Sequence, residues 1–353
     1  STFLPYGGPL GTLIGITLGA LVTMVVAKNY HYLINKYPGS GGTYTYTKKI
    51  LGYDQGFLCA WFLLLVYVAI IWANASALPL IARTLLGDTF QFGFHYVVAG
   101  FDVYMGEILL ALSALMLTAL FTLNKKLSEK VQIISALLLL ISVVTCFILC
   151  LTKMPDKSII FEPAYPKDSS SFNAIFTIFA LAPWAYVGFE NVCHSSGEVK
   201  FSLTKTYRII VISLICSAIA YIALALIGVT GFPSGVNNWQ DYISNLGNYS
   251  GLSSQPVFFN AYNYLGNLGS ILLGVGALCG IITGLIGNYV AASRLIYSLA
   301  EDSLISKWFT KKNNDDVPAN AIYAILAISI ILPFFGRTAI SWIVDVTTVG
   351  ATI

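Results

Sequence analysis

The sequence predicts an all-α polytopic membrane protein, on the basis of its composition, its long apolar segments and the charges of its loops. Of the 353 residues, 57% are hydrophobic and only 10% are charged, whereas a soluble domain carries about 25% charged residues. A bilayer explains the difference, because lipid excludes charge and favours long apolar segments. Helices are expected rather than strands, because each span in lipid must satisfy its own backbone hydrogen bonds.

Apolar segments long enough to span a bilayer recur along the whole chain. A helix of about 20 apolar residues crosses the hydrocarbon core. We predict such helices at 10–33, 54–82, 106–123, 131–151, 172–193, 208–231, 266–299 and 319–336, with a ninth that begins near 340. The segment 266–299 is too long for one perpendicular span, so we expect it to tilt or to extend beyond the bilayer.

The loops between these segments alternate in positive charge. Fourteen Lys and Arg residues lie in the predicted loops on one side and five lie on the other. The richer set is Lys28, Lys36, Lys48, Lys49, Lys125, Lys126, Lys130, Lys200, Lys205, Arg208, Arg294, Lys307, Lys311 and Lys312. The positive-inside rule makes this set cytoplasmic. The chain would then start outside and stop within an apolar run, so we expect a fragment truncated at both ends. The net charge of +3 gives no indication of a nucleic-acid partner.

Neither catalysis nor metal binding is predicted. The three histidines, His31, His95 and His194, lie near span ends or in loops, and no two share a helix face. The six cysteines lie in or beside apolar stretches without a Cys-x-x-Cys pair, which favours buried apolar side chains over disulfides or a metal site. No nucleophile-elbow or phosphate-loop motif occurs in the sequence. We therefore expect no enzyme activity and no cofactor.

The most informative segment runs from Phe179 to Glu190 and contains Pro183 and Gly188. A proline inside a helix removes one backbone hydrogen bond and clashes with the preceding turn, and the glycine that follows favours a break at mid-membrane. Transporters use such breaks because the freed N–H and C=O groups bind the charged groups of a substrate. A kinked helix with a purely structural role is the alternative.

Three side chains beside the predicted break have two possible roles each. A carboxylate as deep as that of Glu190 is costly in lipid and usually faces a cavity or a partner, although it could instead extend toward cytoplasmic water. Trp184 and Tyr186 could close over a substrate as an aromatic gate, or they could simply pack against neighbouring helices.

The stretch 274–288 is rich in glycine, and small residues allow helices to approach closely. Packing is therefore the leading interpretation of these glycines. Thr283 and Asn288 are the polar exceptions, and either could reach a cavity.

Three stretches, in order along the chain, carry a family resemblance. They are Tyr37-Pro38-Gly39-Ser40-Gly41-Gly42-Thr43-Tyr44-Thr45-Tyr46 with Gly52, Gly56, Phe57 and Trp61; Pro183 to Glu190 with Gly197-Glu198-Val199-Lys200; and Ala291-Ala292-Ser293-Arg294 through Ala300-Glu301-Asp302-Ser303-Leu304-Ile305. They resemble the Pro-x-x-Gly-Gly-x-Tyr-x-Tyr loop, the sixth helix and the end of the eighth helix of the amino acid–polyamine–organocation transporter superfamily.

The resemblance implies one transmembrane domain over residues 1–353, equivalent to family helices two to ten, with helix one and the helices after ten absent. It implies a leucine-transporter-like fold of two inverted five-helix repeats. The substrate would lie at mid-membrane between broken helices one and six. The predicted substrate-binding residues are Ala182, Pro183, Trp184, Ala185, Tyr186, Gly188, Thr283 and Asn288, with Trp184 and Glu190 as gating or proton-sensitive residues.

The function implied is secondary active transport of amino acids across the plasma or inner membrane by alternating access, as a proton symporter or an exchanger. The partners would be an amino acid, the lipid bilayer and, in the symport mode, protons. The oligomeric state is not predicted. Transport of polyamines or organic cations is one alternative, but only Glu190 supplies a mid-membrane carboxylate. A non-transporting membrane receptor on the same fold is another.

The sequence departs from the family pattern at three places. The stretch 30–36 lacks the acidic residue that family members often carry at the end of helix two, and Phe201-Ser202 replaces the usual Asn-Pro. Residues 131–151 contain no lysine, so the lysine that some proton-coupled members place in helix five is missing here.

Overall fold

The fold was analysed in a computed structural model, which describes residues 3–154, 161–198 and 202–336. Its contacts divide the chain into two compact units. Unit 1 comprises Ser1–Ala27, Leu137–Val187 and Arg208–Ala277, and unit 2 comprises Lys28–Ala136, Gly188–Tyr207 and Leu278–Ile353. Several long helices therefore contribute one part to each unit.

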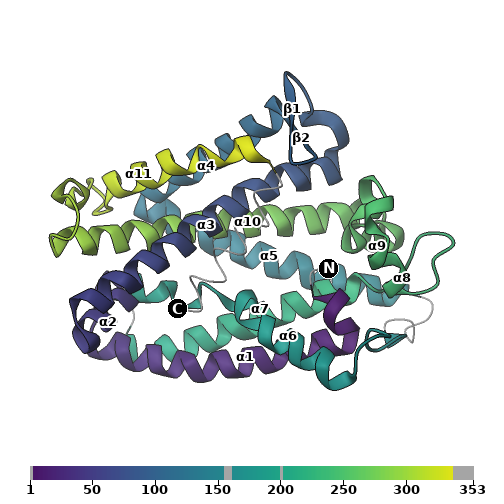
Figure 1. The fold of residues 1–353 in the computed structure, drawn as a ribbon, viewed down its shortest axis with the longest axis horizontal. Coiled ribbons are helices and arrows are strands. Elements are labelled where there is room, and N and C mark those ends of the chain that lie inside the picture. Colours follow the sequence, from purple (N-terminus) through teal and green to yellow (C-terminus); the bar gives the residue numbers. More distant parts are fainter. Residues whose placement is uncertain (1–2, 155–160, 199–201, 337–353) are drawn as a thin grey trace. The chain divides into compact units, whose positions relative to one another are not determined.

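The described residues are mostly helical (Figure 1). The α-helices are α1 (Leu4–Lys36), α2 (Thr43–Leu51), α3 (Tyr53–Leu86), α4 (Met105–Leu123), α5 (Lys125–Lys153), α6 (Ser171–Tyr186), α7 (Thr206–Ile227), α8 (Trp239–Ser244), α9 (Pro256–Leu265), α10 (Asn267–Glu301) and α11 (Ala319–Ser329). The 3-10 helices are η1 (Gly87–Phe90), η3 (Phe189–Ser195), η4 (Leu203–Lys205), η5 (Leu246–Asn248), η6 (Gly251–Ser254), η7 (Lys307–Thr310) and η8 (Leu332–Phe335). Two short strands, β1 (His95–Val98) and β2 (Phe101–Tyr104), complete the fold.

Seven helical segments of the described chain are long and apolar enough to cross a membrane, and each corresponds to a predicted span. The eighth predicted span, 319–336, is interrupted: α11 ends at Ser329, and η8 follows with Pro333 inside it. Proline has no N–H to donate to the preceding turn, which explains why the regular helix does not continue. The ninth predicted span lies outside the described residues.

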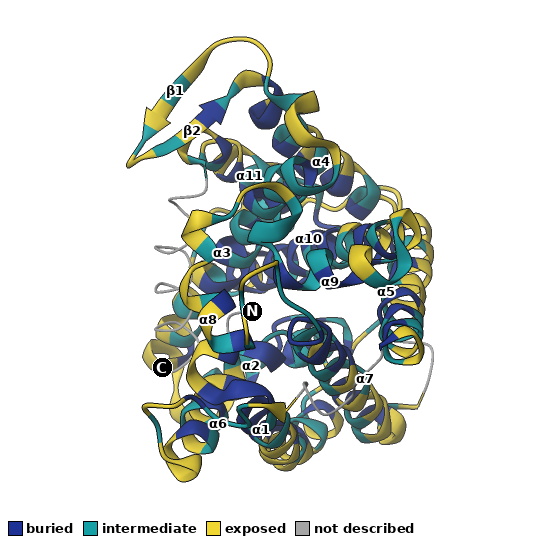
Figure 2. Cartoon of the chain, turned by 90° about the vertical axis from the view of Figure 1, so that its right-hand side faces the viewer, coloured by how far each residue is buried: buried dark blue, intermediate teal, exposed yellow. Residues whose placement is uncertain are grey.

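Many large apolar side chains on these helices are exposed, and Figure 2 marks long stretches of the helices as exposed. On α5 and α7 they include Ile134, Leu137, Leu138, Ile141, Ile148, Ile209, Ile212, Ile215 and Ile219. Contiguous apolar surface of this extent would be costly in water and is what the hydrocarbon core of a bilayer covers. The chain is therefore a multi-pass membrane protein.

A small β-hairpin between α3 and α4 was not predicted. Its antiparallel strands pair His95 with Tyr104, and Ala99 and Gly100 form the turn with φ angles of 46° and 83°. Arg83 at the end of α3 forms an ion pair with Glu107 of α4 and donates to the Asp102 carbonyl at 2.5 Å. The ion pair and this carbonyl contact fix the hairpin to the ends of both helices, and Figure 2 shows it to be largely exposed.

The long loop 232–265 contains two short α-helices, α8 and α9. Trp239 at the start of α8 is only 1% exposed, and its indole N–H donates to the Pro163 carbonyl at 2.7 Å. This anchor holds the loop within unit 1.

Within unit 1, two glycines allow α1 and α6 to pack in close contact. A Cβ atom built on Gly15 would lie 2.6 Å from the Ile178 side chain, and one on Gly19 would lie 2.2 Å from the Ala182 Cβ. Distances below 3.0 Å cannot be accommodated without movement of the helices. Small residues therefore set the spacing of α1 and α6, as they do in many membrane helix pairs.

Replacing Gly19 by alanine should lower the free energy of unfolding by about 1–3 kcal/mol, the usual cost of overpacking a tight contact. Gly11→Ala is the matched control, because a Cβ there would meet α6 at an ordinary 3.5 Å. Denaturation of the purified protein in bicelles measures both variants. Equal losses for Gly19→Ala and Gly11→Ala would contradict the close approach.

Candidate functional site

The fifth predicted span, 172–193, breaks at Val187 and Gly188, as the sequence indicates. The helix α6 continues through Pro183 and ends at Tyr186. Val187 leaves helical geometry with ψ of 134°, and Gly188 follows with φ of 104°. An L-residue side chain strongly disfavours that φ, whereas glycine adopts it readily. The prediction of a break is thus confirmed, but the glycine and not the proline marks its position.

Glu190 lies just beyond the break and folds back onto it. Its Oε2 accepts a hydrogen bond from the Gly188 backbone N–H at 3.0 Å, and the side chain is only 7% exposed. The neighbouring Phe189 ring packs edge-on against Tyr30, with centroids 5.2 Å apart. The carboxylate is therefore an interior group that satisfies a backbone donor at the break, rather than one extended toward solvent.

The predicted binding residues on the α6 side of the break differ in their surroundings. Ala182 is buried against Gly19, and the Tyr186 hydroxyl donates to the Ile16 carbonyl at 2.9 Å. Both contacts pack α6 onto α1. Ala185 is buried, Trp184 is half-buried and Pro183 is exposed. Binding of a substrate by these residues stays a prediction.

Beyond the break, η3 is held by the loop that precedes α2. The buried His194 is hydrogen-bonded through Nε2 to the Tyr67 hydroxyl at 2.9 Å and through Nδ1 to the Ser40 carbonyl at 3.3 Å. Ser196 donates to the Gly39 carbonyl at 2.9 Å and accepts from the Gly39 N–H at 3.1 Å. The Pro-x-x-Gly-Gly stretch and the segment after the break are therefore in direct contact.

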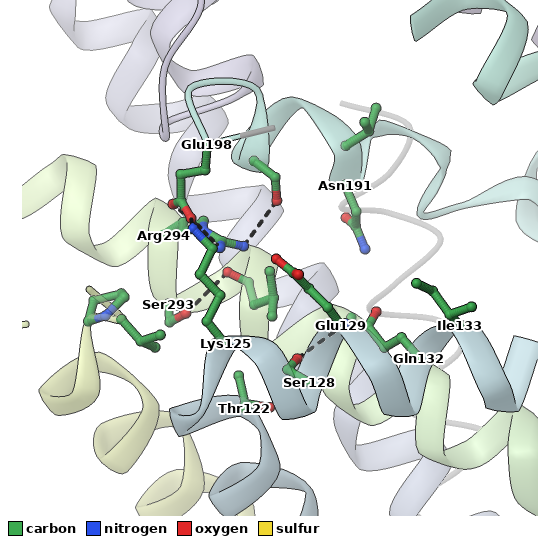
Figure 3. Close-up of a pocket in the computed structure, with 16 residues that line it drawn as sticks. Thr122, Lys125, Ser128, Glu129, Gln132, Ile133, Asn191, Glu198, Ser293 and Arg294 are labelled. Atoms are coloured by element: carbon green, nitrogen blue, oxygen red, sulfur yellow. Dashed lines mark hydrogen bonds and ion pairs between the residues drawn. The ribbon is translucent and has the colours of Figure 1, made fainter. Parts of the chain in front are cut away.

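A half-buried ion-pair triad joins the same segment to α10 and α5 (Figure 3). The Glu198 carboxylate accepts from Arg294 Nε and Nη2, both at 3.0 Å, and pairs with Lys125. Arg294 Nη1 also donates to the Ser195 hydroxyl at 3.0 Å. Burial alone would raise the pKa of Glu198, but the two cations outweigh it and lower that pKa below its ordinary value. The Glu198 carboxylate is therefore ionised at neutral pH.

A cavity of about 520 Å³ lies beside this triad, entirely within unit 2. Residues of α4, α5, η3 and α10 line it, together with the two residues that precede α11. Its polar lining includes Lys125, Glu129, Gln132, Asn191, Ser293 and Arg294 (Figure 3). Pockets that bind small molecules usually measure about 300–1,000 Å³, so the cavity is large enough for such a ligand.

Thr283 and Asn288, the two residues of α10 predicted to bind substrate, differ in whether their polar atoms already have partners. The Thr283 hydroxyl donates to the carbonyls of Cys279 and Gly280 at 2.9 and 3.0 Å, within its own helix. Asn288 is 6% exposed and donates to the Gly284 carbonyl at 2.7 Å, while its Oδ1 has no partner among the described residues. Asn288 thus retains a buried acceptor that a ligand could use, whereas the Thr283 hydroxyl proton is already engaged.

The sequence did not predict the triad or the cavity. Glu198 and Arg294 stood in two of the three family-like stretches, but their partnership across 96 positions left no local pattern. Lys125 was counted only as a loop charge. Opposite charges in the stretches that resemble the family were the one available signal.

In the described chain, no group of His, Cys, Asp or Glu side chains is arranged to hold a metal ion.

Comparison of the sequence with known proteins identifies the family of this chain. The family model described as amino acid permease matches residues 1–352. The branched-chain amino acid permease BcaP of Lactococcus lactis subsp. cremoris is 24% identical over 94% of this chain and 69% of its own length. In Bacillus subtilis, the methylthioribose transporter is 25% identical over 85% of the chain, and another BcaP is 24% identical over 84%. The chain spans 61% of the length of each of these two Bacillus relatives. The match over nearly the whole chain shows that the chain belongs to the amino acid permease family.

Proposed function

We propose that this chain is the larger part of a secondary amino acid transporter of the plasma or inner membrane, which works by alternating access on an inverted-repeat fold. The observation that carries the proposal is the break at Val187 and Gly188 in the fifth span of this amino acid permease chain. Backbone groups freed at such a break bind the carboxylate and ammonium groups of an amino acid. Two relatives are named branched-chain amino acid permeases, which favours leucine, isoleucine and valine as first substrates to test.

The placement of buried acidic groups supports an amino acid over a polyamine. Glu107 and Glu190 are the buried carboxylates in the described spans. Glu107 is paired with Arg83, and Glu190 accepts the Gly188 N–H. A polyamine needs several unpaired carboxylates, because each buried ammonium group must be compensated. A zwitterionic amino acid, which carries one ammonium group and its own carboxylate, does not need several unpaired carboxylates.

Competition in proteoliposomes tests the substrate class. The intact protein should take up labelled leucine, and unlabelled isoleucine and valine should inhibit the uptake strongly. Putrescine, arginine and methylthioribose should inhibit it weakly or not at all. Stronger inhibition by putrescine than by isoleucine would favour the polyamine alternative, and the absence of any substrate flux would favour a receptor.

We further propose that Glu190 is the protonation-sensitive residue of the transport cycle. Protonation would remove the charge that strengthens its hydrogen bond to the Gly188 N–H, and would thereby loosen the segment beyond the break. Glu190→Gln keeps the shape of the side chain but cannot ionise. We expect exchange by the parent to change with pH and exchange by the variant to be independent of pH.

Glu301→Gln is the matched control, because Glu301 is exposed and, among the described residues, its carboxylate has one hydrogen-bond donor, Tyr297 of the same helix. It should retain the pH profile of the parent. Exchange measured against external and internal pH distinguishes the outcomes. A Glu190→Gln variant that folds and shows the parental profile would show that Glu190 acts only as a fixed hydrogen-bond acceptor.

A further inference from the structure

The cavity beside the triad lies beyond the break, on the side that the loop charges predict to be cytoplasmic. Lys125 and Glu198 belong to loops or helix ends of that side. Asn191 lines the cavity from η3, three residues after Gly188. A substrate released from the break toward this side would meet the cavity next.

One end of the cavity offers hydrogen-bond donors. Arg294 has five N–H groups, of which three are used by Glu198 and Ser195. Lys125 has three N–H groups and one partner, Glu198, in the part of the chain that the structure describes. The carboxylate of Glu198 is thereby satisfied, whereas the two cations retain donors and an excess positive charge. This end can bind a carboxylate group.

The remaining polar lining offers acceptors. The Oδ1 atom of Asn191 is buried and has no hydrogen-bond partner among residues 3–154, 161–198 and 202–336. Glu129 lines the cavity with an exposed carboxylate that has no ion pair among the described residues. Figure 3 shows Asn191 reaching the cavity from η3, while the Glu129 side chain from α5 is turned toward the side of Arg294. A buried acceptor without a partner is costly, and an ammonium group would satisfy it.

The rest of the wall is apolar, through Ile133, Val192, Val290 and Val317. The cavity thus combines cationic donors, a carboxylate and an apolar wall. This combination matches a zwitterionic amino acid with an apolar side chain, whose ammonium and carboxylate groups are carried by the same carbon atom. A polycation or a dianion would leave charged groups of one sign uncompensated.

We propose that this cavity is a second binding site for the transported amino acid, on the cytoplasmic side and separate from the site at the break. The substrate carboxylate binds at Lys125 and Arg294, and its ammonium group binds at Asn191 and Glu129. The proposal rests on the proposed function, because it takes the amino acid to be the substrate. The site would hold the substrate after release from the break and set its affinity from the cytoplasm.

Protection of a single cysteine from alkylation tests the proposal. Ile133→Cys is introduced into the intact protein after its six native cysteines have been replaced and leucine transport has been verified. Leucine should slow maleimide labelling at position 133. Leucinol, which lacks the carboxylate, and 4-methylpentanoate, which lacks the ammonium group, should each protect at least about tenfold less effectively, since each loses one charged contact. A cysteine at Ile134, which is exposed but outside the cavity lining, should not be protected.

Variants of the acceptors separate direct occupancy from a conformational change. Asn191→Leu and Glu129→Gln should each raise the half-protecting leucine concentration about fivefold or more, the effect of one lost hydrogen bond. Glu301→Gln should leave it unchanged. An unchanged half-protecting concentration in both acceptor variants would overturn the proposal, as would leucine transport without protection at position 133. Absence of transport by the parent would instead refute the proposed function.

Discussion

Replacing Arg294 by alanine should lower the free energy of unfolding by about 2–4 kcal/mol, since removal of one partner leaves a poorly solvated charge unpaired. The side chains of Arg294, Glu198 and Lys125 are 13%, 26% and 29% exposed. Without Arg294, Glu198 retains only Lys125, and Ser195 loses its donor on α10. We expect transport to fall with stability, because the segment beyond the break loses its direct bonds to α10.

The matched control is Lys312→Ala, which breaks the exposed pair with Asp316. Exposed pairs contribute about 0–1 kcal/mol, so this variant should be nearly as stable as the parent. Denaturation in bicelles gives both values. Arg294→Lys keeps the charge but loses the bidentate geometry, and should lie between the parent and Arg294→Ala. Equal stability of the Arg294→Ala and Lys312→Ala variants would contradict a structural role for the triad.

The pH dependence of the stability lost in Arg294→Ala follows from the pKa of Glu198. The cations hold that pKa below its ordinary value, so the triad's contribution is complete above the ordinary glutamate value of about 4.3. The contribution disappears as the pH falls through the lowered pKa of the folded state. The stability difference between parent and Arg294→Ala should therefore be constant near neutral pH and shrink only in acid.

Replacing Gly188 by alanine should reduce leucine transport by about tenfold or more and lower the free energy of unfolding by about 1–3 kcal/mol, the cost of a strained backbone at a functional site. A Cβ there would meet only Asn191 Nδ2, at an ordinary 3.7 Å. The cost therefore comes from the φ of 104° and not from a clash. An alanine favours helical geometry, which opposes the break.

Gly247→Ala is the control for this substitution. Gly247 has no neighbour within 4 Å of a built Cβ and does not adopt a positive φ, so its alanine variant should be neutral or slightly stabilised. Initial uptake rates and denaturation curves of both variants provide the measurement. Transport by the Gly188→Ala variant at the rate of the parent would show that the break can form without glycine. It would contradict the claim that transport depends on the positive φ at position 188.

The membrane-spanning helices could be predicted from the sequence because apolar length directly reflects bilayer thickness. The break was predicted from Pro183 and Gly188, although only glycine tolerates the φ of 104° at which the helix ends. The hairpin was missed because its strands span only four residues each, too few for a clear alternation of apolar and polar side chains.

Contacts between distant residues could not be predicted from local patterns. Gly19 and Ala182 are unremarkable small residues until α1 and α6 are placed together. Glu198 and Arg294 carry charges whose partners depend on the packing of η3 against α10. The free acceptor of Asn191 likewise becomes visible only when its burial and its neighbours are known.

Counterflow of leucine is the most direct test of the central claim, that this permease carries an amino acid through a site at the break after Tyr186. Proteoliposomes containing the intact protein are loaded with unlabelled leucine and diluted into a trace of labelled leucine. We predict transient accumulation of label above equilibrium in leucine-loaded vesicles, none in empty vesicles, and strong reduction in the Gly188→Ala variant. Absence of counterflow with every common amino acid, from folded protein, would contradict the account.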